Sequence, residues 1–202
     1  MSFKWKLARI LLYLPFKILF RYKIIGKKNI PPRGPVIICP NHTSFWDPPL
    51  VGWASPREVY FLAKKELFTT YKIFGKFIEF YNSIPIDRSS STQAVKKVVE
   101  LLNEGKAVVI FPEATRNRTK DKLLLPLKKG AAMIALKAKA PVIPAFLFES
   151  KGSYWDWMLG KRELKIRFGK PIFTCNLEYN KENINYLTRE LEVRMRELYA
   201  RG

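Results

Sequence analysis

Short apolar runs alternate along this chain with segments of helical periodicity. Six runs have the length and continuous hydrophobicity of buried strands, namely 36–39, 59–62, 83–86, 107–111, 142–148 and 164–168. The segments between and after them that repeat as helices are 66–81, 92–103, 127–139 and 184–199. Continuous apolar strands interleaved with helices are typical of an α/β domain. The pattern predicts a mainly parallel, mixed central sheet that is covered by helices on both faces.

The first 25 residues have a different pattern, in which cationic and aromatic side chains are mixed. Their longest uncharged stretch, 10–16, has seven residues, whereas a transmembrane helix needs about 20. We therefore expect residues 1–25 to form an amphipathic helix that lies in a membrane interface, and 26–202 to form one globular domain. The side chains expected to dock are Lys4, Trp5, Lys6, Arg9, Phe16, Lys17 and Phe20. The alternative is a helix packed on the domain with its lysines in solvent.

Charge narrows the class of partner. The 202 residues include 37 Lys and Arg against 17 Asp and Glu, a net charge of +20, and residues 1–46 contain no acidic side chain. A chain with 48% hydrophobic residues is expected to fold, so the charge lies on a folded protein. The excess of positive charge indicates a polyanionic partner, which is nucleic acid, an anionic membrane or a phosphorylated ligand. Two distant cysteines, Cys39 and Cys175, and a single histidine argue against disulfide frameworks, zinc ribbons and multi-histidine sites.

Three polar clusters directly follow three of the predicted strands, at 41–47, 87–88 and 112–117. In open α/β sheets the carboxyl ends of the strands form the ligand crevice, so the clusters are expected to share one site. His42 and Asp47 are the candidate acid–base pair, because a carboxylate on one imidazole nitrogen fixes the tautomer that takes a proton at the other. The two side chains meet only if the backbone turns between them. Alternatively, Asp47 caps a helix that starts at Pro48, and His42 is an ordinary loop or core histidine.

The other two clusters carry groups that suit a phosphate. Arg88 and Arg116 have planar guanidinium groups that bind phosphate oxygens in a forked geometry. Glu113 is expected to hold an arginine or to accept a hydrogen bond from a substrate hydroxyl, and Lys129 adds positive charge before a helix. The alternatives are surface ion pairs and a solvated lysine.

Four segments taken together resemble a known family. Residues 41–47 (NHTSFWD), 84–88 (IPIDR), 111–116 (FPEATR) and 142–144 (VIP) are similar, in order and spacing, to the four motifs of the glycerolipid acyltransferases. The likeness is greatest to the bacterial 1-acylglycerol-3-phosphate acyltransferases and covers about residues 26–171. One departure is Ala114, where the family usually has glycine; another is Asn82, near a position where glycine is common.

The resemblance implies a role for each matching residue. His42 would be the general base and Asp47 its orienting partner. Arg88, Glu113 and Arg116 would shape the site for the phosphate of the acceptor. Thr115, which is next to Arg116, and Lys129, from its charge alone, are further candidate substrate-binding residues. Pro144 would help to form the substrate pocket or the acyl channel. The family uses an acyl thioester, on coenzyme A or acyl carrier protein, and requires neither a metal nor another cofactor.

The expected activity is acyl transfer to the sn-2 hydroxyl of 1-acylglycerol-3-phosphate, which gives phosphatidic acid. We expect a monomer at the cytoplasmic face of the membrane that binds anionic lipids and no nucleic acid. Alternatives are another lysophospholipid or glycerol 3-phosphate as acceptor, and a covalent acyl intermediate on Cys39 or Ser44. A different class of alternative is a basic protein that binds nucleic acid or membranes without catalysis.

Overall fold

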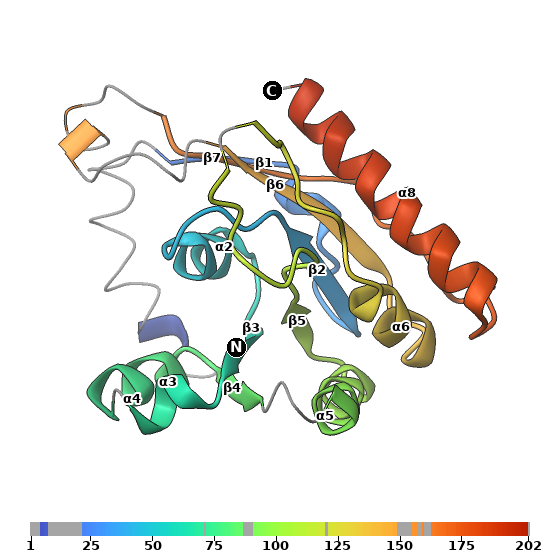
Figure 1. Ribbon diagram of the computed structural model, residues 1–202, viewed down its shortest axis with the longest axis horizontal. Helices are drawn as coiled ribbons and strands as arrows, with labels where there is room; N and C mark the ends of the chain where they lie inside the picture. The colour runs from blue at the N-terminus through green and yellow to red at the C-terminus, as the bar shows by residue number, and fades with distance from the viewer. Residues whose placement is uncertain are drawn as a thin grey trace.

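A seven-stranded sheet forms the centre of the computed structural model, in the order β1-β7-β6-β2-β5-β3-β4 (Figure 1). The structure describes residues 5–7, 22–70, 72–86, 91–119, 121–148, 155–156, 159 and 163–201. Its strands are β1 (Lys23–Ile25), β2 (Val36–Pro40), β3 (Val59–Lys64), β4 (Ser83–Ile86), β5 (Ala107–Val109), β6 (Val142–Phe148) and β7 (Lys165–Phe168). Six of these match the predicted apolar runs to within two residues at each end.

The sheet is mainly parallel but mixed, as predicted. Strands β6, β2, β5, β3 and β4 run in one direction. Strand β7 pairs antiparallel with β6, and β1 pairs parallel with β7. The five parallel strands therefore end at the same edge, where the polar clusters were expected.

Helices cover both faces of the sheet. They are α2 (Asp47–Ala54), α3 (Glu66–Thr69), α4 (Lys72–Phe80), α5 (Ser91–Asn103), α6 (Gly130–Lys137) and α8 (Lys181–Ala200), with a 3₁₀ turn η1 at Lys27–Asn29. Alternate residues of β2 face opposite layers. Val36 and Ile38 lie in the core layer that contains α2, whereas Ile37 and Cys39 lie in the layer that contains α5, α6 and α8. Figure 1 shows α8 on the side of the sheet opposite to α2.

The single helix predicted over 66–81 is instead two helices, α3 and α4. The two pack so closely that a Cβ at Gly75 would stand 2.7 Å from the Phe68 Cα. Only a glycine permits this approach, and the resulting break depends on a contact that the apolar periodicity does not encode.

The expected N-terminal docking helix needs correction where the structure describes it. Residues 5–7 are helical, but Trp5 is only 3% exposed and belongs to the core layer of α2. Its ring lies against Gly52, where an added Cβ would stand 3.5 Å from it. A large aromatic ring buried inside the protein is not presented to a bilayer. The expected membrane insertion of Trp5 is therefore wrong for this arrangement, whereas Lys6 is exposed as expected.

The expected boundary after residue 25 is also corrected. Lys23–Ile25 form β1 and pair with β7, so the sheet begins inside the predicted helix. Tyr22 is buried, stacks on Trp53 with ring centroids 5.0 Å apart, and donates a hydrogen bond to the Leu50 carbonyl. The other predicted docking residues, Lys4, Arg9, Phe16, Lys17 and Phe20, lie outside the described residues. Within the described part of the chain, no helix has the length and hydropathy required to cross a bilayer.

Candidate active site

The catalytic pair predicted from the sequence forms at the carboxyl end of β2. His42 Nδ1 lies 2.8 Å from Asp47 Oδ2. The same oxygen accepts the backbone N–H groups of Thr43 at 2.6 Å and Ser44 at 2.7 Å, so it builds the turn that brings the two side chains together. The geometry confirms that the backbone turns between His42 and Asp47.

The pair differs from both alternatives considered for its members. The residue before α2 is Trp46, and the Asp47 carboxylate bonds to residues on the N-terminal side of the helix rather than capping its first turn. Asp47 is completely buried, whereas the His42 side chain is 18% exposed. Since Nδ1 is engaged by the carboxylate, proton exchange with a substrate falls to Nε2.

The segment after β5 holds His42 at three further points. The His42 N–H donates to Glu113 Oε1 at 2.7 Å, and the His42 carbonyl accepts the Asn117 N–H at 2.7 Å. The imidazole stacks on Phe111 with ring centroids 4.2 Å apart. Strands β2 and β5 are neighbours in the sheet, which is why the two polar clusters at their ends meet.

Glu113 has a different place from the one expected. Its side chain is 1% exposed, and its second oxygen, Oε2, accepts the Leu125 N–H at 2.7 Å. Burial raises the pKa of Glu113, while the hydrogen bonds from Leu125 and His42 act in the opposite direction. The expected contact of this carboxylate with an arginine or a substrate hydroxyl is corrected, because each oxygen accepts a backbone amide inside the protein.

Three of the remaining predicted phosphate ligands belong to segments that the structure describes. Thr115 and Arg116 are exposed and directly precede Asn117, which bonds to the His42 carbonyl. Lys129 is exposed at the start of α6, and the Lys128 N–H donates to the Pro112 carbonyl at 2.8 Å, which joins this segment to the same loop.

The second predicted arginine, Arg88, lies outside the described residues. Strand β4, which precedes it, is the third neighbour of β2, so the two strands are separated by about 14 Å at ordinary strand spacing. The sequence order of the motifs does not reveal this separation, because it depends on the order of the strands in the sheet.

Pro144 is a core residue rather than the lining of a visible channel. It lies within β6 opposite Cys39 of β2 and is buried. A Cβ at Gly169 would stand 2.8 Å from its ring, and its carbonyl accepts the Gly169 N–H at 2.8 Å. Pro144 thus packs between β6 and the segment after β7, and its contact with a substrate pocket or acyl channel stays a prediction.

The two candidate nucleophiles, Cys39 and Ser44, both have structural surroundings. Cys39 is buried, and burial raises the pKa of its thiol far above the ordinary value, so the reactive thiolate is suppressed. The Ser44 hydroxyl oxygen accepts the Trp46 N–H at 3.2 Å and supports the turn before α2.

Two buried asparagines that the sequence interpretation did not single out complete the site. Asn41 Oδ1 accepts the Leu147 N–H at 2.7 Å, and its Nδ2 donates to the Leu147 carbonyl at 3.1 Å. Asn117 Nδ2 donates to the Lys122 carbonyl at 2.7 Å. The only available signal was their position, one residue before His42 and one residue after Arg116.

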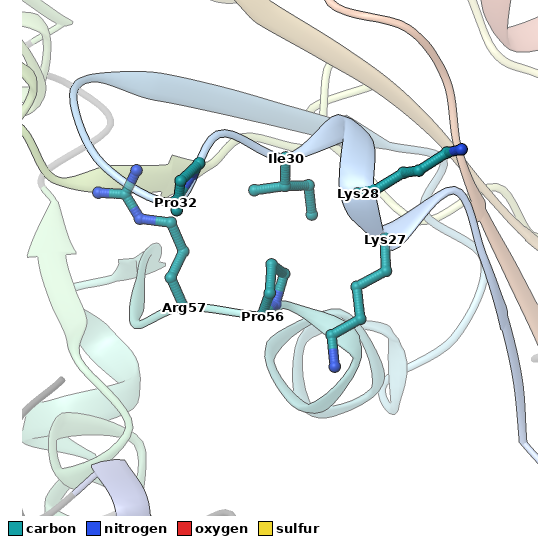
Figure 2. Close-up of a pocket in the computed structure, with 6 residues that line it drawn as sticks. All are labelled: Lys27, Lys28, Ile30, Pro32, Pro56 and Arg57. Atoms are coloured by element: carbon teal, nitrogen blue, oxygen red, sulfur yellow. The ribbon is translucent and has the colours of Figure 1, made fainter.

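A separate hollow of about 530 Å³ lies at the amino ends of the strands, away from His42 (Figure 2). It is lined by Lys27, Lys28, Ile30, Pro32, Pro56 and Arg57. The Arg57 guanidinium donates to the carbonyls of Pro31, Gly34 and Gly105, so it joins three loops of the fold. Among the described residues, no group of three His, Cys, Asp or Glu side chains is placed to bind a metal.

Comparison with known proteins gives one consistent family. The model of the acyltransferase family matches residues 21–147. A 1-acyl-sn-glycerol-3-phosphate acyltransferase of Bacillus subtilis is 32% identical over 180 residues, which cover 87% of each chain. One from Cocos nucifera is 33% identical over 73% of this chain, which spans about half (49%) of that protein. The 1-acyl-sn-glycerophosphate acyltransferase structure from Thermotoga maritima shares the fold, with a TM-score of 0.72 at 24% identity, over 97% of this chain and 78% of that one.

Proposed function

Because the chain belongs to the acyltransferase family, we propose that it transfers a fatty acyl group from an acyl thioester to the sn-2 hydroxyl of 1-acylglycerol-3-phosphate, giving phosphatidic acid. The observation that carries the mechanism is the 2.8 Å contact between His42 Nδ1 and Asp47 Oδ2 at the carboxyl edge of a parallel sheet. The exposed Arg116 stands one residue from the amide that holds the His42 carbonyl, which favours a phosphorylated acceptor.

The proposed reaction is a direct transfer between the two substrates. His42 Nε2 removes the proton of the glycerol hydroxyl as its oxygen forms a bond to the thioester carbonyl carbon. The resulting tetrahedral intermediate collapses with cleavage of the carbon–sulfur bond. The imidazolium then returns the proton to the departing thiolate, so His42 ends the cycle neutral.

Asp47 contributes through Oδ2, which accepts the Nδ1–H of His42. This hydrogen bond selects the tautomer whose Nε2 carries a lone pair. The negative charge of the Asp47 carboxylate stabilises the imidazolium that forms during the reaction. A buried carboxylate is well suited to this role because few competing water dipoles weaken its interaction with the ring.

Recognition of the acceptor phosphate is proposed for Arg116 together with Thr115 and Lys129, all of them exposed near the loop that holds His42. A guanidinium group binds two phosphate oxygens at once, whereas an ammonium group acts as a point charge. Arg88 remains a predicted member of the same site.

Association with the cytoplasmic face of an anionic membrane is proposed from charge. Residues 1–46 carry nine cationic and no acidic side chains, and each Lys or Arg close to an anionic leaflet contributes about 1 kcal/mol. Both the single-chain acceptor and the two-chain product are lipids, so a site beside the bilayer avoids moving either through water. Coenzyme A or an acidic acyl carrier protein would meet the same basic surface.

The test is a panel of acceptors assayed with one acyl-coenzyme A. The panel contains 1-acylglycerol-3-phosphate, glycerol 3-phosphate, 1-acylglycerol and lysophosphatidylcholine. We expect kcat/KM to be highest for 1-acylglycerol-3-phosphate, by about tenfold or more over 1-acylglycerol, because 1-acylglycerol lacks the phosphate that pairs with Arg116. Equal rates with the phosphate-free acceptor, or a preference for another member of the panel, would reject the proposed substrate.

A further inference from the structure

Glu113 carries an almost completely enclosed carboxyl group near His42 that the proposed reaction does not use. Its carboxylate is 1% exposed and links two loops that are distant in sequence. Oε1 accepts the N–H of His42 in the loop between β2 and α2, and Oε2 accepts the N–H of Leu125 in the segment before α6, each at 2.7 Å. Both distances are well within the range of an ordinary hydrogen bond.

The contacts around Glu113 favour a role inside the protein over a role in substrate binding. Each of its oxygens already accepts a main-chain amide, and almost none of the side chain is open to solvent. A carboxylate is also a poor ligand for a phosphate, because the two negative charges repel.

The same loop contacts His42 at both ends of its main-chain unit. Glu113 accepts the His42 N–H and the Asn117 N–H donates to the His42 carbonyl, with Thr115 and Arg116 between them in sequence. Asp47 controls the orientation of the imidazole ring, whereas these two contacts control where the backbone of His42 stands. The catalytic base and the loop that carries Arg116 are thereby joined as one unit.

We propose that Glu113 is a positioning residue, which acts through the His42 backbone to set the distance between the base and the acceptor hydroxyl, and does not bind the acceptor. This inference rests on the proposed function of His42 as the general base. The inference gives the Glu113 carboxylate a role different from that of Arg116 in the same loop, which is proposed to bind the phosphate directly.

The informative variant is Glu113→Gln, because the two partners are both donors. A glutamine has one acceptor oxygen and one NH₂ group, so one of the two N–H contacts is lost in either orientation of the amide. A displaced base lowers the rate of chemistry while leaving the phosphate contacts of the acceptor intact. We expect kcat to fall by about 10- to 100-fold and KM for 1-acylglycerol-3-phosphate to stay within about threefold of wild type.

Two comparisons make this expectation specific. Arg116→Ala should have the opposite effect on the two constants, with KM for the phosphorylated acceptor raised about tenfold or more and kcat changed less. Exposed Glu104→Gln serves as the matched control and should leave both constants unchanged. Glu113→Gln should also lower kcat for acyl transfer to 1-acylglycerol and to 1-acylglycerol-3-phosphate by the same factor, because the displaced base affects both acceptors and the phosphate contacts are unchanged.

The inference and the proposed function fail in different ways. If Glu113→Gln raises KM only for the phosphorylated acceptor with kcat retained, or changes neither constant, the positioning role is wrong while the activity stands. If His42→Ala retains wild-type activity, the proposed function of the base fails first. Should Glu113→Gln not fold, Glu113→Asp keeps the charge but shortens the reach, and the same fall in kcat at constant KM is expected.

Discussion

Three hydrogen bonds converge on one oxygen atom of Asp47. They come from the His42 ring and from the backbone N–H groups of Thr43 and Ser44. The carboxylate therefore orients the base and also closes the turn that brings the base into place. A change at Asp47 would alter both at once, so His42 is the cleaner position at which to test the chemistry.

The two departures from the family's glycines occur where the backbone has a left-handed conformation. Ala114 has φ 59° and Asn82 has φ 56°. Position 114, where the family usually has glycine, thus has the backbone conformation that favours glycine. Asparagine tolerates this region better than alanine does, because its short polar side chain bonds to the nearby backbone.

Replacing Ala114 with glycine should stabilise the protein. A left-handed non-glycine residue costs about 1–2 kcal/mol, and the extra freedom of glycine in the unfolded chain returns about 0.4–1 kcal/mol of that. We expect the free energy of unfolding to rise by about 0.5–1 kcal/mol, measured by urea denaturation. Ala94→Gly in α5 is the control and should lower stability by about 1 kcal/mol; a loss of stability at Ala114→Gly as well would contradict the strain.

At the scale of elements, most of the sheet could be predicted because buried parallel strands appear as continuous apolar runs. Strand β1 could not, since Lys23–Ile25 is only three residues long and directly follows a cationic, aromatic segment that resembles a surface helix. The break between α3 and α4 was not predicted for another reason, because it depends on the close contact of Gly75 with Phe68.

The N-terminal segment has a structural role as well as its proposed electrostatic one, and the two are separable at adjacent residues. Trp5 lies in the core against Gly52, whereas Lys6 is exposed. Trp5→Ala should lower the free energy of unfolding by about 3–5 kcal/mol in urea denaturation, because it leaves a large cavity. Lys6→Glu should leave stability within about 0.5 kcal/mol and weaken sedimentation with anionic vesicles.

If Trp5→Ala unfolds like wild type but no longer sediments with vesicles, the ring serves the membrane and not the core. Deleting residues 1–25 would not discriminate these roles, since it removes the core ring of Trp5, the buried Tyr22 and the edge strand β1 together.

At the scale of the whole molecule, the sequence predicted which chemistry collects at one edge of the sheet, but not how each group is used. His42, Asp47 and Arg116 each follow an apolar run, which was sufficient to predict that they lie at one edge of the sheet. The burial of Glu113 was not predictable, because it depends on the amide of Leu125, which arrives from a separate segment. The packing of Pro144 against Gly169 was likewise not predictable, because Gly169 belongs to a separate segment after β7.

The net charge of +20 also separates into parts once the fold is known. Arg57 is committed to three backbone carbonyls at the amino ends of the strands. Arg116 and Lys129 remain exposed near the base, and Lys6 is exposed near the start of the chain. These four cationic side chains therefore lie in different parts of the fold and have different surroundings.

The most direct test of the account is acyl transfer by His42→Ala, measured with an acyl-coenzyme A and 1-acylglycerol-3-phosphate. The side chain makes one hydrogen bond and one ring contact at the edge of the site, so circular dichroism should show a folded variant. We predict that kcat falls by at least about 100-fold, the usual contribution of a general base. A folded variant that retains activity within a few-fold of wild type would contradict the assignment of His42 as the base.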